Sequence, residues 1–171
     1  VGVLHHLRDP LAGWRILCEL LAPGGVMKIG LYSEAARRGV VAARALAERH
    51  GLGVDLAAVR EIRRLVLAHP DAEPARALVD TVDFHSASGA RDLMLHVQEH
   101  RYTLPQIAAA LAALALEFLG FELDEPGVFA AYRERFPDDP CAVSLDHWEQ
   151  FERDHPHVFA GMYQFWVRST V

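Results

Sequence analysis

The chain has 171 residues, of which 51% are hydrophobic and 23% charged, and its formal net charge is −6. This length and composition are typical of one globular domain that buries a core. Nucleic-acid binding needs clustered Lys and Arg, so the acidic balance argues against DNA or RNA as a partner.

The cysteines and the apolar runs favour a cytoplasmic protein. Cys18 and Cys141 have no Cys-x-x-Cys spacing, so neither a disulfide framework nor a zinc knuckle is predicted. The longest apolar stretch, residues 108–116, is much shorter than the roughly 20 residues that span a bilayer, and we expect no membrane contact. The chain opens on the apolar residues 1–4 without Met or the basic start of a signal peptide, which we interpret as the beginning of a fragment.

The first segment predicts a strand, a helix and a second strand. Residues 1–4 are apolar and resemble the end of a buried strand, and residues 5–10 form a polar turn. Apolar residues recur at helical spacing over residues 11–21, until Pro23-Gly24-Gly25 ends the pattern. Residues 26–32 are a short apolar run between breakers, which is typical of a buried strand.

A helical block follows. Residues 34–78 have a helical pattern, and Asp55 is placed to cap a second helix after Gly51-Leu52-Gly53. Residues 86–89, Ser-Ala-Ser-Gly, predict a loop. Residues 90–99 predict a further short helix that carries a polar cluster.

The last third returns to alternating helices and strands. Thr103 and Gln106 have the spacing of a capping box and predict a helix through Ala115. Strands are predicted over residues 116–123 and 162–168, with a helix over residues 145–154 that Ser144 caps. This order indicates an α/β sheet, in which ligands bind at the carboxyl ends of the strands.

Two sets of motifs resemble a known family. Val3-Leu4-His5-His6, the helix that ends in Leu21-Ala22-Pro23-Gly24-Gly25, and the strand that follows are similar, in order and spacing, to the later motifs of class I methyltransferases. Further blocks resemble the downstream half of bacterial methyltransferases that often carry tetratricopeptide repeats. These blocks are Phe84-His85-Ser86, Arg91-Asp92-Leu93, residues 96–101 and residues 161–167.

The resemblance implies a partial doubly wound, Rossmann-like methyltransferase sheet of the α/β class, whose N-terminal cofactor-binding half is absent. It implies one domain fragment, with residues 1–33 and 103–171 forming the sheet and its helices, and residues 34–102 forming a helical insertion or lid. The cofactor would be S-adenosylmethionine, and the acceptor a small molecule or a peptide. No Gly-x-Gly-x-Gly motif occurs in the chain, so cofactor binding by this chain alone is not expected.

The resemblance places Val3, Leu4 and His5 beside the cofactor, and His5 and His6 near the methyl-transfer centre. A neutral imidazole can take a proton from an O–H or N–H acceptor near pH 7. These histidines are therefore the candidate catalytic residues. The alternative is that they only cap the helix that follows.

Candidate substrate-binding residues lie after the second strand and in the polar cluster. Tyr32 and Arg37 follow the strand, and Arg37 could grip a carboxylate or phosphate with two hydrogen bonds. The alternative for Arg37 is a solvated helix charge. The cluster is a predicted lid over the substrate, or else a solvated surface. It consists of Arg91, Asp92, His96, Glu99 and His100.

Four other interpretations remain. Residues 96–100 match H-x-x-E-H, a pattern that binds zinc from one helix face, although so short a motif arises easily by chance. A second hypothesis is a non-catalytic interaction fragment of a methyltransferase. Half a sheet would leave an edge strand and an apolar helix face uncovered, so we expect the fragment to be marginally stable, or else to form a homodimer through that edge or to swap segments. The aromatic residues Trp14, Phe118, Phe121, Phe165 and Trp166 are predicted to be core.

Overall fold

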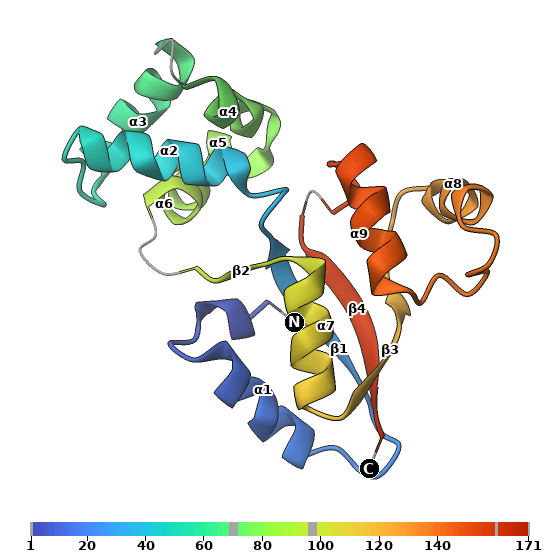
Figure 1. The fold of residues 1–171 in the computed structure, drawn as a ribbon. Coiled ribbons are helices and arrows are strands. Elements are labelled where there is room, and N and C mark those ends of the chain that lie inside the picture. The colour runs from blue at the N-terminus through green and yellow to red at the C-terminus, as the bar shows by residue number, and fades with distance from the viewer. Residues whose placement is uncertain (1, 69–71, 96–98, 160, 171) are drawn as a thin grey trace. The chain divides into compact units, whose positions relative to one another are not determined.

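The structure is a computed structural model that describes residues 2–68, 72–95, 99–159 and 161–170. The chain divides into two compact units. Unit 1 comprises Val1–Ala36 and His100–Val171, and unit 2 comprises Arg37–Glu99. Figure 1 shows that unit 1 contains the sheet, whereas unit 2 is built from helices.

Unit 1 contains a four-stranded mixed sheet in the order β2-β1-β4-β3. The strands are β1 (Val26–Ser33), β2 (Arg101–Tyr102), β3 (Leu116–Phe121) and β4 (Tyr163–Ser169). β4 is antiparallel to both β1 and β3, and β2 is parallel to β1. Three strands therefore run in one direction and β4 runs in the other, which confirms the predicted α/β class.

Helices connect the strands of unit 1, and three of them were predicted. They are the short 3-10 helix η1 (Leu4–His6), α1 (Pro10–Glu19), α7 (Leu104–Ala113), α8 (Val128–Arg135) and α9 (Leu145–Asp154). The capping box that predicted α7 is present, because Thr103 accepts from Gln106 and the Gln106 side chain accepts from the Thr103 amide. Ser144 caps α9 as expected, with its Oγ 3.2 Å from the His147 amide. The sequence interpretation did not include α8 or β2.

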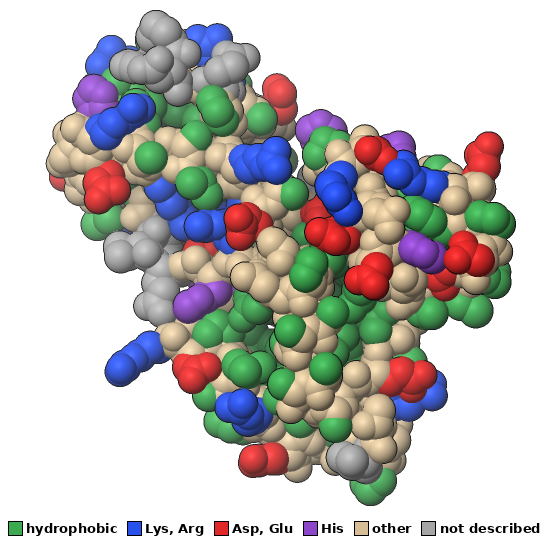
Figure 2. Space-filling model, viewed as in Figure 1, with side chains coloured by type: hydrophobic (Ala, Val, Ile, Leu, Met, Phe, Trp, Pro, Cys, Tyr) green, Lys and Arg blue, Asp and Glu red, His purple; other side chains and the backbone are tan. Residues whose placement is uncertain are grey.

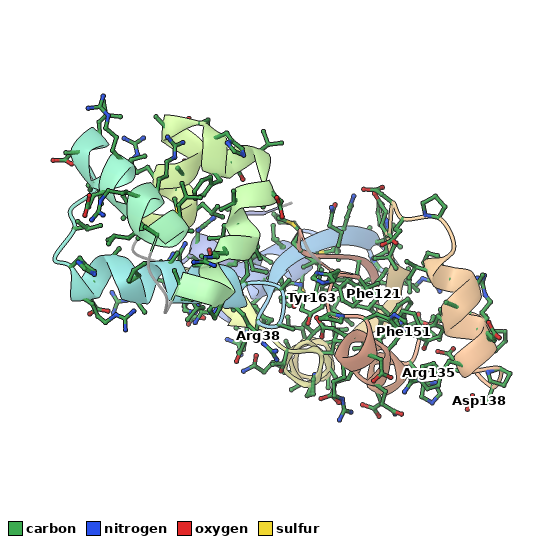
Figure 3. All side chains as sticks on the ribbon, turned by 90° about the horizontal axis from the view of Figure 1, so that it is seen from above. Arg38, Phe121, Arg135, Asp138, Phe151 and Tyr163 are labelled. Carbon is green, nitrogen blue, oxygen red and sulfur yellow. The ribbon has the colours of Figure 1, made fainter. Side chains whose placement is uncertain are left out.

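One face of the sheet carries the core of unit 1. Ile29 and Leu31 of β1 alternate with polar neighbours, and Phe165 and Tyr163 of β4 lie opposite them. Figures 1 and 3 show α7 and α9 on this face, with Phe121, Phe151 and Tyr163 gathered between the strands and α9.

The other face of the sheet is polar. Lys28 lies opposite Trp166 there, and both side chains contact Glu122. Trp166 is 40% exposed, so its prediction as a core residue is wrong. It occupies the alternate position of a strand that buries only one face.

The predicted opening strand is wrong for the residues that the structure describes. Gly2 has a left-handed φ of 77°. The backbone then turns into η1, where the His6 amide bonds to the Val3 carbonyl and the Leu7 amide to the Leu4 carbonyl. Amides satisfied within a turn are not available to a sheet ladder. The sequence predicted that β1 would pair in parallel with the opening segment. Instead, β1 pairs in antiparallel orientation with β4.

Unit 2 buries a separate helical core. Its elements are α2 (Arg38–Arg49), α3 (Leu56–Ala68), α4 (Glu73–Arg76), the 3-10 helix η3 (Ala77–Asp80), α5 (Val82–His85) and α6 (Ala87–Leu95). Asp55 caps α3 as predicted, because its Oδ1 accepts from the Ala58 amide at 2.8 Å. Within the part of the chain that the structure describes, every helix is too short or too polar to cross a bilayer.

The loop predicted at residues 86–89 is wrong, since these residues begin α6. Ser86 caps the helix, and its Oγ accepts from the Gly89 amide at 2.9 Å. Gly89 suggested a loop, but its role is packing. A Cβ at this position would lie 2.8 Å from the backbone oxygen of Asp83 in α5, so α5 and α6 approach through a residue without a side chain.

Candidate functional site

Two histidines and a tyrosine meet at the carboxyl end of β1. The His5 ring lies 4.0 Å from that of Tyr32 and 4.3 Å from that of His6, between ring centroids. His5 Nδ1 is 3.3 Å from the carbonyl oxygen of Gly30, which ties η1 to β1. His5 is fully buried and His6 is exposed. Of the two predicted catalytic residues, His6 is therefore the one that a substrate can reach directly.

His100 belongs to the same cluster. Its backbone amide donates to the His5 carbonyl at 2.8 Å. The next residues form β2, which pairs with Tyr32 and Ser33 at the end of β1. Unit 1 thus brings together four predicted site residues, which are His5, His6, Tyr32 and His100. We define these four as the histidine cluster.

The three predicted cofactor-binding residues differ in exposure. Val3 is 63% exposed, whereas Leu4 and His5 are buried. Val3 and Leu4 line a cleft of about 330 Å³ along β1, together with Gly2, Leu7, Gly13, Leu17, Lys28, Ile29 and Gly30. The cleft is mostly apolar, and Lys28 contributes the one charged side chain among these lining residues. None of these lining residues has a side chain that could accept from the ribose hydroxyls, so they do not fit the whole of S-adenosylmethionine.

A buried carboxylate also lies at this end of the sheet, and the sequence interpretation missed it. Glu152 of α9 accepts from the Ser33 hydroxyl at 2.8 Å and from the Tyr163 hydroxyl at 2.8 Å. Burial, together with the nearby Glu152 charge, raises the pKa of the Tyr163 hydroxyl. The signal was present in the sequence, because Trp148, Phe151 and Glu152 share one helical face. The network fixes the ends of β1 and β4 against α9.

In unit 2, two predicted substrate-binding residues pair with each other. Arg37 forms a two-pronged ion pair with Glu99, and Arg44 Nη2 lies 3.0 Å from Glu99 Oε2. The Glu99 side chain is 1% exposed. Burial alone would raise the pKa of this carboxyl, but the hydrogen bonds and charges of Arg37 and Arg44 outweigh burial and hold the pKa below its ordinary value. The arginines thus hold Glu99 inside unit 2.

The other predicted lid residues are exposed or lie outside the described residues. Arg91 and Asp92 are exposed on α6, with Arg91 Nε 3.8 Å from Asp92 Oδ1. His96 lies outside the described residues. Helix α6 ends at Leu95, and Glu99 and His100 are in no helix. Of the residues that the structure describes, Glu99 and His100 therefore do not share the helix face that the H-x-x-E-H zinc pattern requires.

Comparisons with known proteins give relatives of the chain but no family. No protein-family model matches the chain. Over 127 residues the chain is 34% identical to an uncharacterized protein of Synechococcus sp.. The match covers 71% of this chain and 30% of that protein, so the chain spans less than a third of the relative's length. The relative's name states no activity, and a function must be argued from the geometry.

Proposed function

We propose that this chain is the C-terminal, acceptor-side part of an S-adenosylmethionine-dependent methyltransferase. The observation that carries the proposal is the histidine cluster at the carboxyl end of β1, the edge where α/β sheets bind ligands. A sheet with three strands in one direction and one antiparallel strand is compatible with a doubly wound fold. The motif resemblance supplies the reaction class.

The residues of the cluster have distinct proposed roles. His6 is exposed, and its imidazole is placed to accept a proton from the O–H or N–H group that is methylated. The buried His5 fixes the turn through Gly30 and packs on Tyr32. Tyr32 forms the wall on which the acceptor rests. The remaining contacts to the cofactor would come from residues outside this chain, because the residues that line the cleft at Val3 and Leu4 include no acceptor side chain.

Calorimetric titration with S-adenosylmethionine and S-adenosylhomocysteine tests this proposal. A longer protein that contains this chain is expected to bind both compounds. His6→Ala should leave cofactor binding intact while abolishing methyl transfer, and the exposed neighbour variant Arg8→Gln serves as the control for general damage to this turn. Absence of binding by the longer protein would contradict the assignment.

A second candidate function is a non-catalytic interaction fragment, and the free edge of β1 favours it. Residues Val26–Leu31 pair with β4 on one side, and among the described residues only the end of β1 pairs with β2 on the other. Exposed apolar side chains of the same unit include Val3, Ile16, Leu17, Leu20 and Val26. Unpaired edges and apolar patches of this kind promote association. Micromolar cofactor binding by the 171-residue chain alone would contradict this second candidate.

The free edge of β1 and the exposed apolar side chains of unit 1 lead to a prediction about assembly. We expect the isolated chain to form a homodimer in size-exclusion chromatography with light scattering, and Leu20→Glu to shift it to the monomer. Leu20 is 77% exposed in unit 1, and Leu56 is 61% exposed in unit 2, so Leu56→Glu is the matched control. A monomeric wild-type chain, or an equal response to both variants, would refute association through this surface.

A further inference from the structure

A second cleft of unit 1 is lined by none of the residues of the histidine cluster. It has a volume of about 470 Å³ and lies between the start of α8 and the end of α9. We call it the α8–α9 cleft. Its lining residues are Glu125, Pro126, Gly127, Val128, Ala131, Phe151, Asp154, His155, Pro156, His157 and Val158.

The cleft lies at the ligand-binding edge of the sheet. Residues 125–128 follow the carboxyl end of β3, and residues 154–158 lead into the start of β4. Because β1 and β3 are both antiparallel to β4, their carboxyl ends are on the same edge. This edge is where α/β sheets bind small molecules.

The walls of the cleft are apolar. Phe151 is buried at its base, and its ring lies 4.3 Å from that of His155. Val128 and Val158 are half-buried and complete the apolar surface. Small-molecule sites typically have volumes of roughly 300–1,000 Å³, apolar walls and a few polar groups that orient the ligand. The α8–α9 cleft meets each of these criteria.

The charged groups of the cleft are carboxylates. Asp154 pairs with Arg135. Glu125 is exposed and forms no ion pair with any residue that the structure describes. Figure 2 shows further Asp and Glu side chains over α8 and α9. An electronegative mouth over an apolar base favours a ligand that carries one positive charge and a hydrocarbon body.

We propose that the α8–α9 cleft binds a small apolar amine. The ammonium group faces Glu125, which forms no ion pair with the described residues, and the hydrocarbon body packs on Phe151 and Val158. The proposal depends on the cleft alone and is independent of the methyltransferase assignment. If the protein did not bind S-adenosylmethionine, the proposal that the cleft binds an amine would be unaffected.

Three probes of similar size test the charge preference of the full chain by ligand-observed NMR and calorimetry. They are 2-phenylethylamine, 2-phenylethanol and 3-phenylpropionate. We expect the amine to bind at least about threefold more tightly than the alcohol, since an exposed ion pair adds a small but measurable attraction. The acid should bind weakest. Tighter binding of the acid would overturn the proposal, because the histidines and the start of α8 would then select an anion.

Two variants locate the site. Glu125→Gln should weaken amine binding about threefold and leave alcohol binding unchanged, whereas the control Glu134→Gln, an exposed carboxylate of α8 outside the cleft, should change neither. Ala131→Phe should fill the cleft and remove binding of every probe, with circular dichroism confirming the fold. Unchanged amine affinity in Ala131→Phe, or the same response to Glu125→Gln and Glu134→Gln, would overturn the proposal.

Discussion

Replacing Glu99 by Gln is expected to destabilise unit 2 by about 2–3 kcal/mol, because both Arg37 and Arg44 lose the buried carboxylate that they contact. The guanidinium groups are partly exposed, which places the expected loss at the lower end of the range for a broken buried pair. Amide hydrogen exchange of α2 and α6 measures this loss directly. Unchanged protection of both helices in the variant would contradict the structural role of Glu99.

The same ion pairs make unit 2 sensitive to acid. The pKa of Glu99 is lower in the folded state than its ordinary value, which is about 4.3. The carboxylate therefore stabilises unit 2 fully above that pH, and its contribution is lost as the pH falls through the folded pKa. The stability difference between wild type and Glu99→Gln should shrink over this acidic range.

A surface pair provides the control for Glu99. Glu61 of α3 also pairs with an arginine, Arg64, but both side chains are largely exposed. Because exposed ion pairs contribute little, Glu61→Gln should leave the exchange protection of unit 2 unchanged.

Replacing Trp148 by Ala should cost unit 1 about 3–5 kcal/mol, the usual price of deleting a buried aromatic side chain. Trp148 is fully buried, stacks on Tyr132 at 4.1 Å and contacts Phe121 at 5.3 Å between ring centroids. Its indole Nε1 also donates to the Ala142 carbonyl at 2.8 Å. Urea denaturation followed by far-ultraviolet circular dichroism measures the loss.

Trp166 supplies the matched control for Trp148. It lies on the polar face of the sheet, and its Nε1 donates to Glu122 at 3.0 Å. Trp166→Ala should lower the free energy of unfolding by about 1 kcal/mol or less. Similar losses in the two variants would show that the sheet buries both faces in solution.

Local signals predicted most elements of the fold. Thr103 with Gln106, Asp55 and Ser144 each marked a helix start through a capping hydrogen bond formed within three residues, so sequence alone was sufficient. Helix α8 has no such signal, because Gly127 precedes it without a side-chain cap. The placement of α8 depends instead on tertiary contacts, such as the stacking of Tyr132 on Trp148 of α9 at 4.1 Å between ring centroids.

The site was harder to predict, because its contacts join distant segments. The motifs indicated His5 and Tyr32, and the structure places these rings together. They did not indicate that Glu99 would be held by Arg37 across 62 positions of sequence. The prediction of a strand over residues 1–4 was wrong because an apolar run does not distinguish a strand from a turn. Here the turn buries Leu4 and His5.

The points where the chain leaves and re-enters unit 1 are adjacent. The Glu34 amide bonds to the Tyr102 carbonyl at 2.9 Å, immediately before and after the helical segment. Arg37 and Glu99, which are the first and last residues of unit 2, form an ion pair with each other. The helical segment therefore connects two neighbouring points of the sheet, as a short hairpin loop would. The entropic cost of bringing these two points together depends only weakly on the length of the segment between them. A longer or shorter segment between these two points would therefore leave the pairing of the strands unchanged.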